Sequence, residues 1–440
     1  MAEKELLQQL HVLKSIDLQQ RDDIAQDLQQ SIRLLIVTQF YPPDYAATGQ
    51  LIEELAVQLG KMGVRVRVFA GQPGYAFNRD SAPGFERSGR LQVVRSRASQ
   101  IWPHRIRGRA INGFLFCIRA GLHLLKRARE NDVLLLTTEP PYLTILGYLA
   151  HLFFRIPYVC LLYDLYPDVV VELNVLKKHH WLVRFWDWLN GRIWRNAQAI
   201  VVLSSTMKDR IVTKCPGIAS KTIVIHSWAN PDIIKPIDKT SNWFAQQFDL
   251  EDKFTVLYSG NMGRCHDIDT ILAAAEALQD EPIQFLFIGG GAKRRISAEK
   301  ALSLGLSNCR FLPYQKKGDL PYSLTAGDLS LVSISPGMEG LVAPSKLYGI
   351  LATGRPVAVI CEPHSYLRQL ICEAKCGEAF DNGDDRGLAQ FIYRLAHNAL
   401  LAKALGNAGR RYLQSHFTPE ITASQYLKVL VNSVRTRSDR

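Results

Sequence analysis

A lysine stands in an unusual place in the stretch SPGMEGLVAPSKLYGILATGRPVAVI, residues 335–360. A strand is predicted to end at Ile334, and Ser345 and Lys346 then begin a helix that ends at Gly354. Ser345 is a suitable N-cap. A lysine in the first turn has the unfavourable charge for the helix dipole, whose N-terminal end prefers anions. We therefore expect a bound anion of the phosphate type beside Lys346; the alternative is a lysine that extends into solvent.

A second turn with the same potential is YSGNMGRCHDIDTIL, residues 258–272, which follows another predicted strand. Its glycine and polar residues are Gly260, Asn261, Gly263, Arg264 and His266. The turn is neither a G-x-G-x-x-G fingerprint nor a P-loop. A helix N-terminus with one arginine still suits a diphosphate, because bidentate arginine–phosphate hydrogen bonds are strong. Alternatively, the histidine caps the helix or pairs locally with Asp267.

The third turn, FYPPDYAATGQ at residues 40–50, follows the first predicted strand. Two prolines end that strand, and Thr48 and Gly49 then open a helix. Free N–H groups at a helix start favour an anion, and a glycine lets a phosphate approach the backbone. The alternative is that Gly49 serves only close packing of the chain.

Short β-branched runs alternate with helical patterns along the whole chain, which predicts parallel βαβ units. The expected strands are residues 32–38, 64–70, 132–137, 157–161, 199–203, 254–258, 283–288, 309–312, 329–334 and 356–360. A helix is expected over residues 49–62, where leucines recur on one face. The pattern stops near Ser227 and restarts at Phe254. The fold class is therefore α/β, with two tandem doubly wound, Rossmann-like domains that face a central cleft.

The expected domains follow from the interruption, which contains the proline-bearing segment SWANPDIIKPID. Residues 1–30 form an extension, expected to be helical, and residues 31–230 form the first domain. Residues 231–240 are the linker and residues 241–415 form the second domain. A last helix, over residues 419–434, is expected to pack back on the first domain as part of residues 416–440.

The positive charge of the chain is concentrated. Lys and Arg number 53 against 41 Asp and Glu, a net charge of +12, and residues 87–129 hold eleven basic residues and no acidic one. This segment carries Trp102, Phe114 and Phe116, so we expect a surface that attracts phosphates of nucleic acid or anionic lipid. The alternative is a solvated basic face. A second aromatic and basic stretch, residues 180–195, points the same way, unless its aromatic residues form a buried helix face.

Other classes of site are disfavoured by the composition. The eight cysteines lack disulfide-scaffold density and zinc-site spacing, which fits a reducing cytoplasm. The first 30 residues are polar and unlike a secretory signal. The longest apolar stretch, residues 142–154, has 13 residues, whereas a membrane span takes about 20. We expect a cytoplasmic protein that does not cross a membrane.

The three turns, in their order along the chain (residues 40–50, 258–272 and 335–360), resemble the family-4 retaining glycosyltransferases of the GT-B fold, from about residue 32 to residue 430. PSKLYGILATGRPV is most similar to the WbuB-type branch, which builds bacterial surface polysaccharides. The resemblance implies a hexosyl transfer from a nucleotide-diphosphate-sugar donor to a saccharide acceptor linked to polyprenyl diphosphate. The donor is a co-substrate of unknown base, and no cofactor is implied.

Roles for single residues follow from the same resemblance. Arg264 and Lys346 would neutralise the leaving diphosphate, Glu339 would reach the sugar hydroxyls, and Asp164 would lie near the anomeric carbon, with Glu139 as a weaker candidate. For the last two, local capping or pairing is the alternative. The donor-binding residues implied are Gly49, Gly260, Asn261, Gly263, His266, Gly290, Tyr314, Ser345 and Leu347. The acceptor and membrane surface would comprise Trp102, Arg105, Arg107 and Arg109, aided by Phe114.

The chain departs from the family pattern at two glutamates, whose places are taken by Leu341 and Gly349. Arg264 matches the family's basic residue by proximity and not by register. No DxD-like carboxylate pair follows a strand, so we expect metal-independent catalysis in which cations and helix N–H groups stabilise the leaving group. Front-face substitution with retention is the mechanism that we infer.

Three other functions stay open at this point. A nucleotide-sugar 2-epimerase would use the same fold without an acceptor, and a non-catalytic scaffold would explain the missing glutamate. A nucleic-acid-binding protein rests on the basic segment alone, since no motif of that class is present and no nucleic-acid partner is expected.

Overall fold

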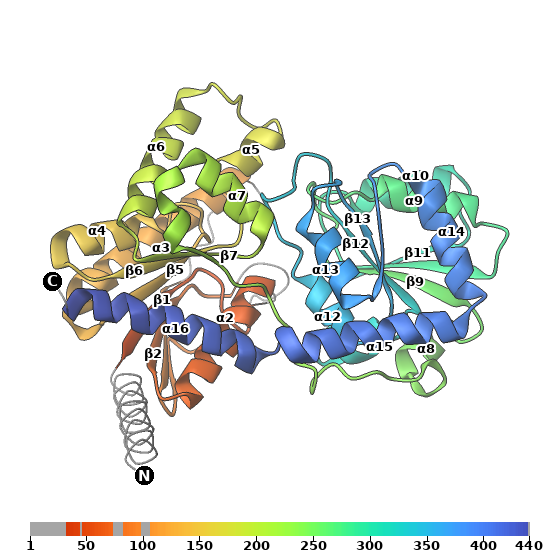
Figure 1. Ribbon diagram of the computed structural model, residues 1–440, viewed down its shortest axis with the longest axis horizontal. Coiled ribbons are helices and arrows are strands. Elements are labelled where there is room, and N and C mark those ends of the chain that lie inside the picture. Colours follow the sequence, from red (N-terminus) through yellow and green to blue (C-terminus); the bar gives the residue numbers. More distant parts are fainter. Residues whose placement is uncertain (1–31, 45, 74–81, 98–105, 439–440) are drawn as a thin grey trace, which may run out of the picture. The chain divides into compact units, whose positions relative to one another are not determined.

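Two sheets flanked by helices form the core of the computed structural model, which describes residues 32–44, 46–73, 82–97 and 106–438 (Figure 1). The first sheet has the strand order β3-β4-β2-β1-β5-β6-β7-β8, and the second has the order β11-β10-β9-β12-β13-β14. The pairs β1–β2, β1–β5, β2–β4, β5–β6 and β7–β8 are parallel, and β3–β4 is antiparallel. All pairs of the second sheet are parallel. The expected fold class, α/β with two doubly wound, largely parallel sheets, is confirmed, while the cleft between them stays a prediction.

The strands of the first sheet are β1 Arg33–Val37, β2 Arg65–Ala70, β3 Phe85–Ser88, β4 Leu91–Arg95, β5 Val133–Thr137, β6 Tyr158–Leu162, β7 Ala199–Val202 and β8 Thr222–Val224. Those of the second sheet are β9 Phe254–Ser259, β10 Ile283–Ile288, β11 Cys309–Leu312, β12 Leu329–Ser333, β13 Val357–Ile360 and β14 Gly377–Phe380. Every expected strand is present, because runs such as VLLLT in β5 and IQFLFI in β10 are buried on both faces. The sequence patterns missed β3, β4, β8 and β14. Of these, β3 is fully exposed and β8 has three residues, so neither has a hydrophobic pattern of its own.

The α-helices of the first half are α2 Ala47–Lys61, α3 Ile106–Arg127, α4 Ile145–Phe154, α5 Asp168–Glu172, α6 Trp181–Asn196, α7 Ser205–Lys214 and α8 Trp243–Gln247. Those of the second half are α9 Asp269–Ala277, α10 Arg294–Ser303, α11 Leu320–Thr325, α12 Lys346–Ala352, α13 Tyr366–Ala374, α14 Asp385–Ala396, α15 Ala399–His416 and α16 Pro419–Ser438. The helices expected over residues 49–62 and 419–434 are therefore confirmed as α2 and α16. The helix expected in residues 1–30 lies outside the described residues.

Contacts between residues group the chain into two compact units. The first comprises Met1–Leu161, Asn196–Ala199 and Ala423–Arg440, and the second comprises Leu162–Arg195 and Ile200–Thr422. Helices α5 to α7 thus belong to the same unit as the second sheet. The domain boundaries expected from the sequence were drawn at a change of pattern and not by compactness, and they stay a prediction.

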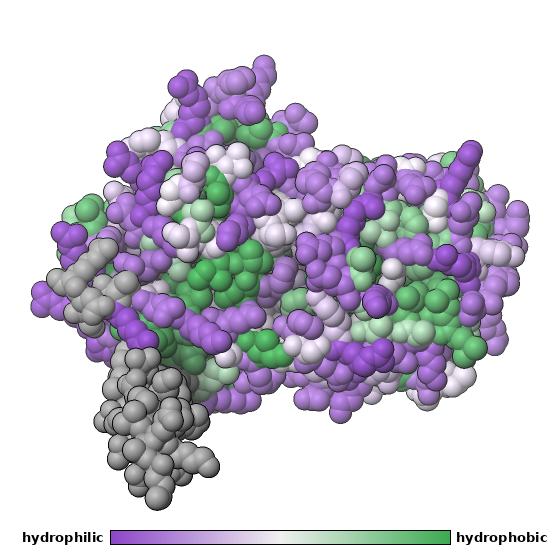
Figure 2. All heavy atoms as spheres, viewed as in Figure 1, coloured by the Kyte–Doolittle hydropathy of each residue, from purple (hydrophilic) through white to green (hydrophobic). Residues whose placement is uncertain are grey.

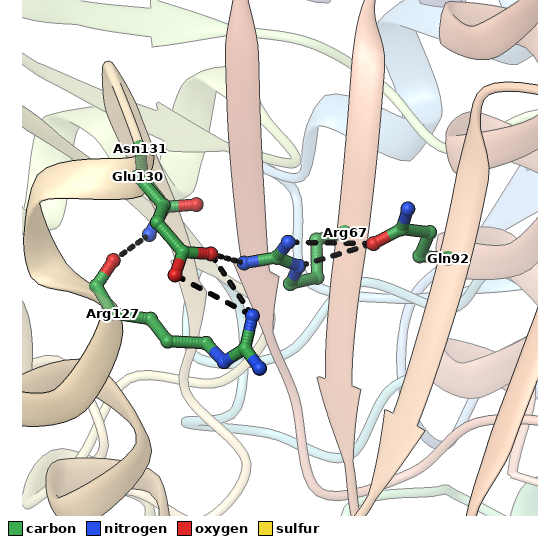
Figure 3. A network of polar contacts seen from close by, with 5 residues as sticks. All are labelled: Arg67, Gln92, Arg127, Glu130 and Asn131. Atoms are coloured by element: carbon green, nitrogen blue, oxygen red, sulfur yellow. Dashed lines mark hydrogen bonds and ion pairs between the residues drawn. The ribbon is translucent and has the colours of Figure 1, made fainter.

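A polar network holds the end of α3 against the first sheet (Figure 3). The Oε2 atom of Glu130 accepts hydrogen bonds from Arg67 on β2, at 2.7 Å, and from Arg127 on α3, at 3.0 Å. These bonds, that from Arg67 first, lower the pKa of the Glu130 carboxyl. Arg67 also reaches the Gln92 side chain on β4. Part of the positive charge in residues 87–129 is therefore neutralised by structural pairing, and the basic helix α3 is fixed on the sheet.

Candidate active site

Lys346 begins α12, and its ammonium group is buried without a hydrogen-bond partner among the described residues. Its Nζ atom lies 3.7 Å from the centre of the Tyr258 ring. Burial lowers the pKa of Lys346 to about 7, because a desolvated ammonium is disfavoured. The alternative of a lysine extended into solvent is therefore wrong. Ser345 occupies the N-cap position, but its side chain caps no N–H group, so the expected capping bond is absent.

Glycine loops enclose this ammonium. A Cβ atom on Gly260 would lie 3.4 Å from the Lys346 Nζ atom. Gly260 has φ of +132° and Gly289 has φ of +136°, and a Cβ on Gly289 would fall 2.0 Å from the Gly260 carbonyl oxygen. The turn after β9 and the loop after β10 therefore approach so closely that only glycine fits. The turn after β9 therefore lies against the buried cation, and the loop after β10 packs on that turn.

Further donor-site candidates lie on the same two loops and on the loop after β11. A Cβ on Gly291 would meet the Asn261 side chain, and a Cβ on Gly290 would lie 2.8 Å from the ring of Tyr314, which is partly exposed. The Gly263 backbone contacts the Asn261 amide in the same way. The structure thus gathers these predicted residues, whereas their contact with a donor stays a prediction.

His266 is held by the end of β12 and not by its sequence neighbour. Its Nδ1 atom lies 2.8 Å from the Ser333 carbonyl oxygen, and Asp267 instead accepts bonds from Thr270 and Asn382. The alternative of local pairing between His266 and Asp267 is wrong. Burial, then the charge of Lys346, lowers the pKa of His266 to about 3, so the imidazole is neutral at physiological pH.

Asp164 follows β6 and lies close enough to Cys265 for its charge to raise the pKa of that thiol, after burial. Burial raises the pKa of the Asp164 carboxyl to about 6. The next residue, Leu165, donates its N–H to the Leu341 carbonyl at 2.9 Å. Asp164 therefore lies near both the turn after β9 and the loop after β12, all within the second compact unit.

Glu339 lies in the loop between β12 and α12 and is 1% exposed. Its Oε1 atom accepts a hydrogen bond of 2.7 Å from the hydroxyl of Thr206 on α7, while Oε2 is buried and bonds nothing that the structure describes. Arg210, also on α7, donates from Nε to the Glu339 carbonyl oxygen at 2.7 Å. Sequence reasoning missed both α7 residues; their place just after β7, where the carboxyl end of a strand meets a helix, was the available signal.

Two predicted residues of the second unit are placed differently from this cluster. Arg264 is exposed and makes no ion pair with any residue of the described ranges. Leu347 is completely buried, and its N–H group bonds the Pro344 carbonyl oxygen. Arg264 is therefore available to a ligand, and the Leu347 side chain serves the core.

In the first unit, Gly49 is buried in the first turns of α2, and a Cβ atom there would lie 3.1 Å from the backbone of Phe40 and Tyr41. Close packing of the chain is thus sufficient reason for this glycine, and its expected role toward a phosphate stays a prediction. The Oε2 atom of Glu139 accepts a hydrogen bond of 2.5 Å from the Thr48 hydroxyl, which ties the loop after β5 to the start of α2. This is the pairing role that was the alternative for Glu139.

The expected membrane surface is described only in part. Trp102 and Arg105 lie outside the described residues, and Arg107 and Arg109 belong to α3 without described side chains. Phe114 on α3 is 58% exposed, whereas Phe116 is buried. On α6, Trp181, Phe185 and Trp188 are 68%, 54% and 56% exposed, so the alternative of a buried aromatic face is wrong.

Two features are absent from the described ranges. No group of three or more His, Cys, Asp or Glu side chains there is placed to hold a metal ion. None of the helices described is both long and apolar enough to span a bilayer.

Comparisons with known proteins bear on the whole chain. Residues 47–228 match the family described as "Glycosyl transferase 4-like domain", and residues 239–412 match "Glycosyl transferases group 1". The chain is 25% identical over 401 residues to the probable glycosyltransferase WbjE of Pseudomonas aeruginosa, with 90% of this chain and 96% of WbjE covered.

Two further likenesses agree with that result. The chain is 34% identical over 188 residues to the putative colanic acid biosynthesis glycosyl transferase WcaI of Escherichia coli K12, covering 42% of this chain and 45% of WcaI. Its fold is similar to that of Anabaena HepE in complex with UDP and glucose, with a TM-score of 0.68 and 15% identity over 91% of this chain and 99% of HepE.

Proposed function

The chain belongs to the group 1 glycosyltransferases, the family-4 retaining enzymes of the GT-B fold, and from this premise we propose which reaction its site performs. It transfers a hexosyl group from a nucleotide-diphosphate-sugar to a saccharide linked to polyprenyl diphosphate, in the synthesis of a surface polysaccharide. The name of WbjE supports the activity of a glycosyltransferase, that of WcaI supports polysaccharide synthesis, and the UDP and glucose bound to HepE support the class of donor.

The observation that carries this proposal is the buried, unpartnered ammonium of Lys346. A buried polar group without a partner is unfavourable by about 1–3 kcal/mol, and by more when it is charged. A diphosphate placed against Nζ supplies the missing acceptor and counter-charge. It thereby restores the protonated form of Lys346, whose pKa burial has lowered to about 7.

The reaction proposed at this site is a front-face substitution. The acceptor hydroxyl attacks the anomeric carbon on the face that the diphosphate leaves, the bond from that carbon to the phosphate oxygen breaks, and this oxygen takes the acceptor's proton. Lys346 and the exposed Arg264 stabilise the charge that develops on the diphosphate, so the reaction proceeds without a metal ion. Undiminished turnover in the presence of a chelator is the expected result.

A panel of diphosphates tests the donor site. UDP, GDP, ADP and dTDP are compared by thermal shift, since a ligand at about 100 times its dissociation constant adds about 2.7 kcal/mol of stability. One of them should raise the melting temperature of the wild type, and Lys346→Ala should abolish the shift. Lys403→Ala, which removes an exposed lysine of α15, is the matched control and should keep it. Absence of a shift with all four would favour the scaffold instead.

The lipid-linked acceptor implies that the protein binds the inner face of the membrane from the cytoplasm, and α3 supports this part of the proposal. An apolar stripe at helical spacing is exposed along α3, formed by Ile111, Phe114, Ile118, Leu122 and Leu125. Exposed Lys126 and Arg127 end the helix, and Arg129 follows it. Basic groups beside an apolar helix face are typical of a surface that binds anionic lipid.

Neighbouring α4 extends this surface. The two helices are in contact at Gly121, where a Cβ atom would lie 3.5 Å from Leu146. Leu149, Leu152 and Phe153 of α4 are exposed, and Figure 2 shows apolar surface at the left margin, where Figure 1 has α4. The exposed aromatic residues of α6 are a second candidate contact with the membrane.

Vesicle flotation tests the membrane contact. Phosphatidylcholine vesicles that contain phosphatidylglycerol should bind the protein at low salt and release it as salt rises, because surface charges are screened. Replacing Leu122 and Leu125 by Ser should weaken binding, whereas Leu302→Ser and Leu400→Ser, at exposed leucines of α10 and α15, should not. Equal binding to vesicles without phosphatidylglycerol would contradict the electrostatic part of the proposal.

An assay for epimerisation distinguishes the proposed transferase from the remaining alternative, a 2-epimerase. A nucleotide-sugar 2-epimerase converts its donor without an acceptor and needs no membrane surface. Formation of the 2-epimer from a nucleotide sugar by the purified protein alone would contradict the transferase proposal.

A further inference from the structure

The loop that carries Glu339 is held by helix α7 on both its side chain and its backbone. Thr206 binds the carboxylate at Oε1, at 2.7 Å, and Arg210 binds the backbone at two carbonyl oxygens, those of Glu339 at 2.7 Å and Gly337 at 3.1 Å. Thr206 and Arg210 are four residues apart and therefore lie on one face of α7. The Ser204 hydroxyl, which accepts the Met207 N–H at 3.1 Å, fixes the start of this helix.

The same loop has little freedom to take another shape. Gly337 and Gly340 have φ of +79° and +71°, in the region that favours glycine. A Cβ atom at Gly337 would lie 2.0 Å from Oε1 of Glu172, and one at Gly340 would lie 2.7 Å from the Thr206 carbonyl oxygen. The Gly337 N–H also bonds Oε2 of Glu362 at 3.0 Å. Contacts from α5, α7 and the end of β13 thus fix the loop.

One oxygen of the Glu339 carboxylate is left for something else. Oε1 is taken by Thr206, while Oε2 is buried and has no partner among the described residues. A buried acceptor without a donor is unfavourable by about 1–3 kcal/mol and by more for a charged group, so its persistence needs an explanation. Sugar hydroxyls are neutral donors that suit a single free carboxylate oxygen.

We propose that Thr206 and Arg210 are positioning residues, which aim the free oxygen of Glu339 at a hydroxyl group of the donor's sugar. This inference rests on the proposed function, because it takes the ligand to be a nucleotide-diphosphate-sugar. Thr206 orients the carboxylate by holding one oxygen, and Arg210 keeps the loop backbone in place. Neither residue bonds Lys346, the proposed diphosphate ligand, so we expect their effect to be confined to the sugar.

Affinity for the sugar part of the donor therefore tests the inference. The nucleoside diphosphate among UDP, GDP, ADP and dTDP that binds the wild type is compared with its glucose conjugate by isothermal titration calorimetry. The dissociation constant of the diphosphate divided by that of its glucose conjugate measures how much the sugar strengthens binding. Thr206→Val should weaken binding of the glucose conjugate about tenfold or more, the range for a hydrogen bond to a charged group, and leave diphosphate binding unchanged.

Three further variants show whether the effect is one of positioning. Thr206→Ser, which keeps the hydroxyl, should have the wild-type ratio of dissociation constants. Lysine lacks the planar fork that bonds both carbonyl oxygens, so Arg210→Lys should reduce this ratio. Thr213→Val is the control on α7, because the exposed Thr213 hydroxyl bonds only the Asp209 carbonyl of its own helix.

The outcomes separate the inference from the proposed function. Thr206→Val that leaves the ratio unchanged, or that weakens both ligands equally, would overturn the positioning role. A wild type that binds none of the four diphosphates and none of their glucose conjugates would overturn the proposed function, and the inference with it.

Discussion

Two lysines of the second unit differ in what surrounds their ammonium groups. Lys239, next to the first residues of β9, donates to the Lys253 carbonyl oxygen, the Thr255 hydroxyl and, at 2.6 Å, to Oδ2 of Asp328. Lys346, near the other end of the same strand, lies over the ring of Tyr258, and its ammonium has no hydrogen-bond partner among the described residues. Burial lowers the pKa of both, but Asp328 opposes that effect at Lys239.

The difference agrees with a structural cation at Lys239 and, as proposed above, with a cation at Lys346 that binds a ligand. At Lys239 the chain itself supplies three acceptors, so the ammonium contributes to the folded state. At Lys346 the described residues supply none, which agrees with the proposal that the acceptors come with the ligand. Lys346 lies beside the carboxyl end of β9, which is the end of a parallel sheet where ligands bind.

The largest expected effect concerns turnover. Lys346→Ala should lower kcat by about 10²–10³-fold, which is about 2.7–4 kcal/mol of transition-state stabilisation, because one electrostatic contact to the leaving group is lost. Transfer from the nucleotide-sugar that the wild type uses measures this, with Lys403→Ala as the control. A variant with near wild-type turnover would remove the distinction between the two lysines.

An effect on stability comes next and has opposite signs at the two sites. Lys239→Met removes the cation paired with Asp328, which keeps the Thr255 N–H as a donor. It should lower the free energy of unfolding by about 2–3 kcal/mol, less than for a fully buried pair because both groups are partly exposed. Lys346→Met removes an uncompensated ammonium and should leave that free energy unchanged or raise it. Denaturant unfolding without ligand measures both. If Lys346→Met proved the more damaging of the two, Lys346 would be a structural residue.

The smallest effect concerns Gly349, in the interior of α12. A Cβ atom there would be 3.8 Å from Ile234 and 3.9 Å from Leu324, which are ordinary contacts, so Gly349→Ala should stabilise the protein by about 0.5–1 kcal/mol. Unfolding and diphosphate binding are measured together. Unchanged binding would show that the space beside Gly349 is not used by the diphosphate, and a loss of stability would contradict the steric argument.

Much of the fold could be predicted from the sequence, because buried parallel strands consist of continuous apolar residues. Strands β5 and β10 illustrate this. Strand β3 was not predicted because it is exposed, and β8 was not predicted because it has three residues. Lys346 could be identified from local sequence alone, because it places a positive charge in the first turn of a helix, where the dipole favours anions.

The remaining parts of the site depend on contacts between distant residues. Nothing at Thr206 or Arg210 indicates that both reach a loop more than 120 residues further along the chain. Likewise, local pairing with Asp267 was the alternative considered for His266, whereas the folded chain gives it the Ser333 carbonyl oxygen 67 residues away. The Ser345 hydroxyl was expected to cap α12 and does not, since local preference does not decide a side-chain rotamer.

Proton uptake on diphosphate binding tests the central claim most directly, namely that Lys346 receives the diphosphate. Because the pKa of Lys346 is lowered to about 7, its side chain is mostly the neutral amine at pH 8 in the protein without ligand. Binding an anion raises that pKa, so affinity should fall as the pH rises above 7, and at pH 8 the complex should take up about 0.9 proton. Calorimetry in buffers of different ionisation enthalpy measures the uptake. We expect it in the wild type and not in Lys346→Arg, which is always charged; no uptake in the wild type, or equal uptake in both, would contradict the account.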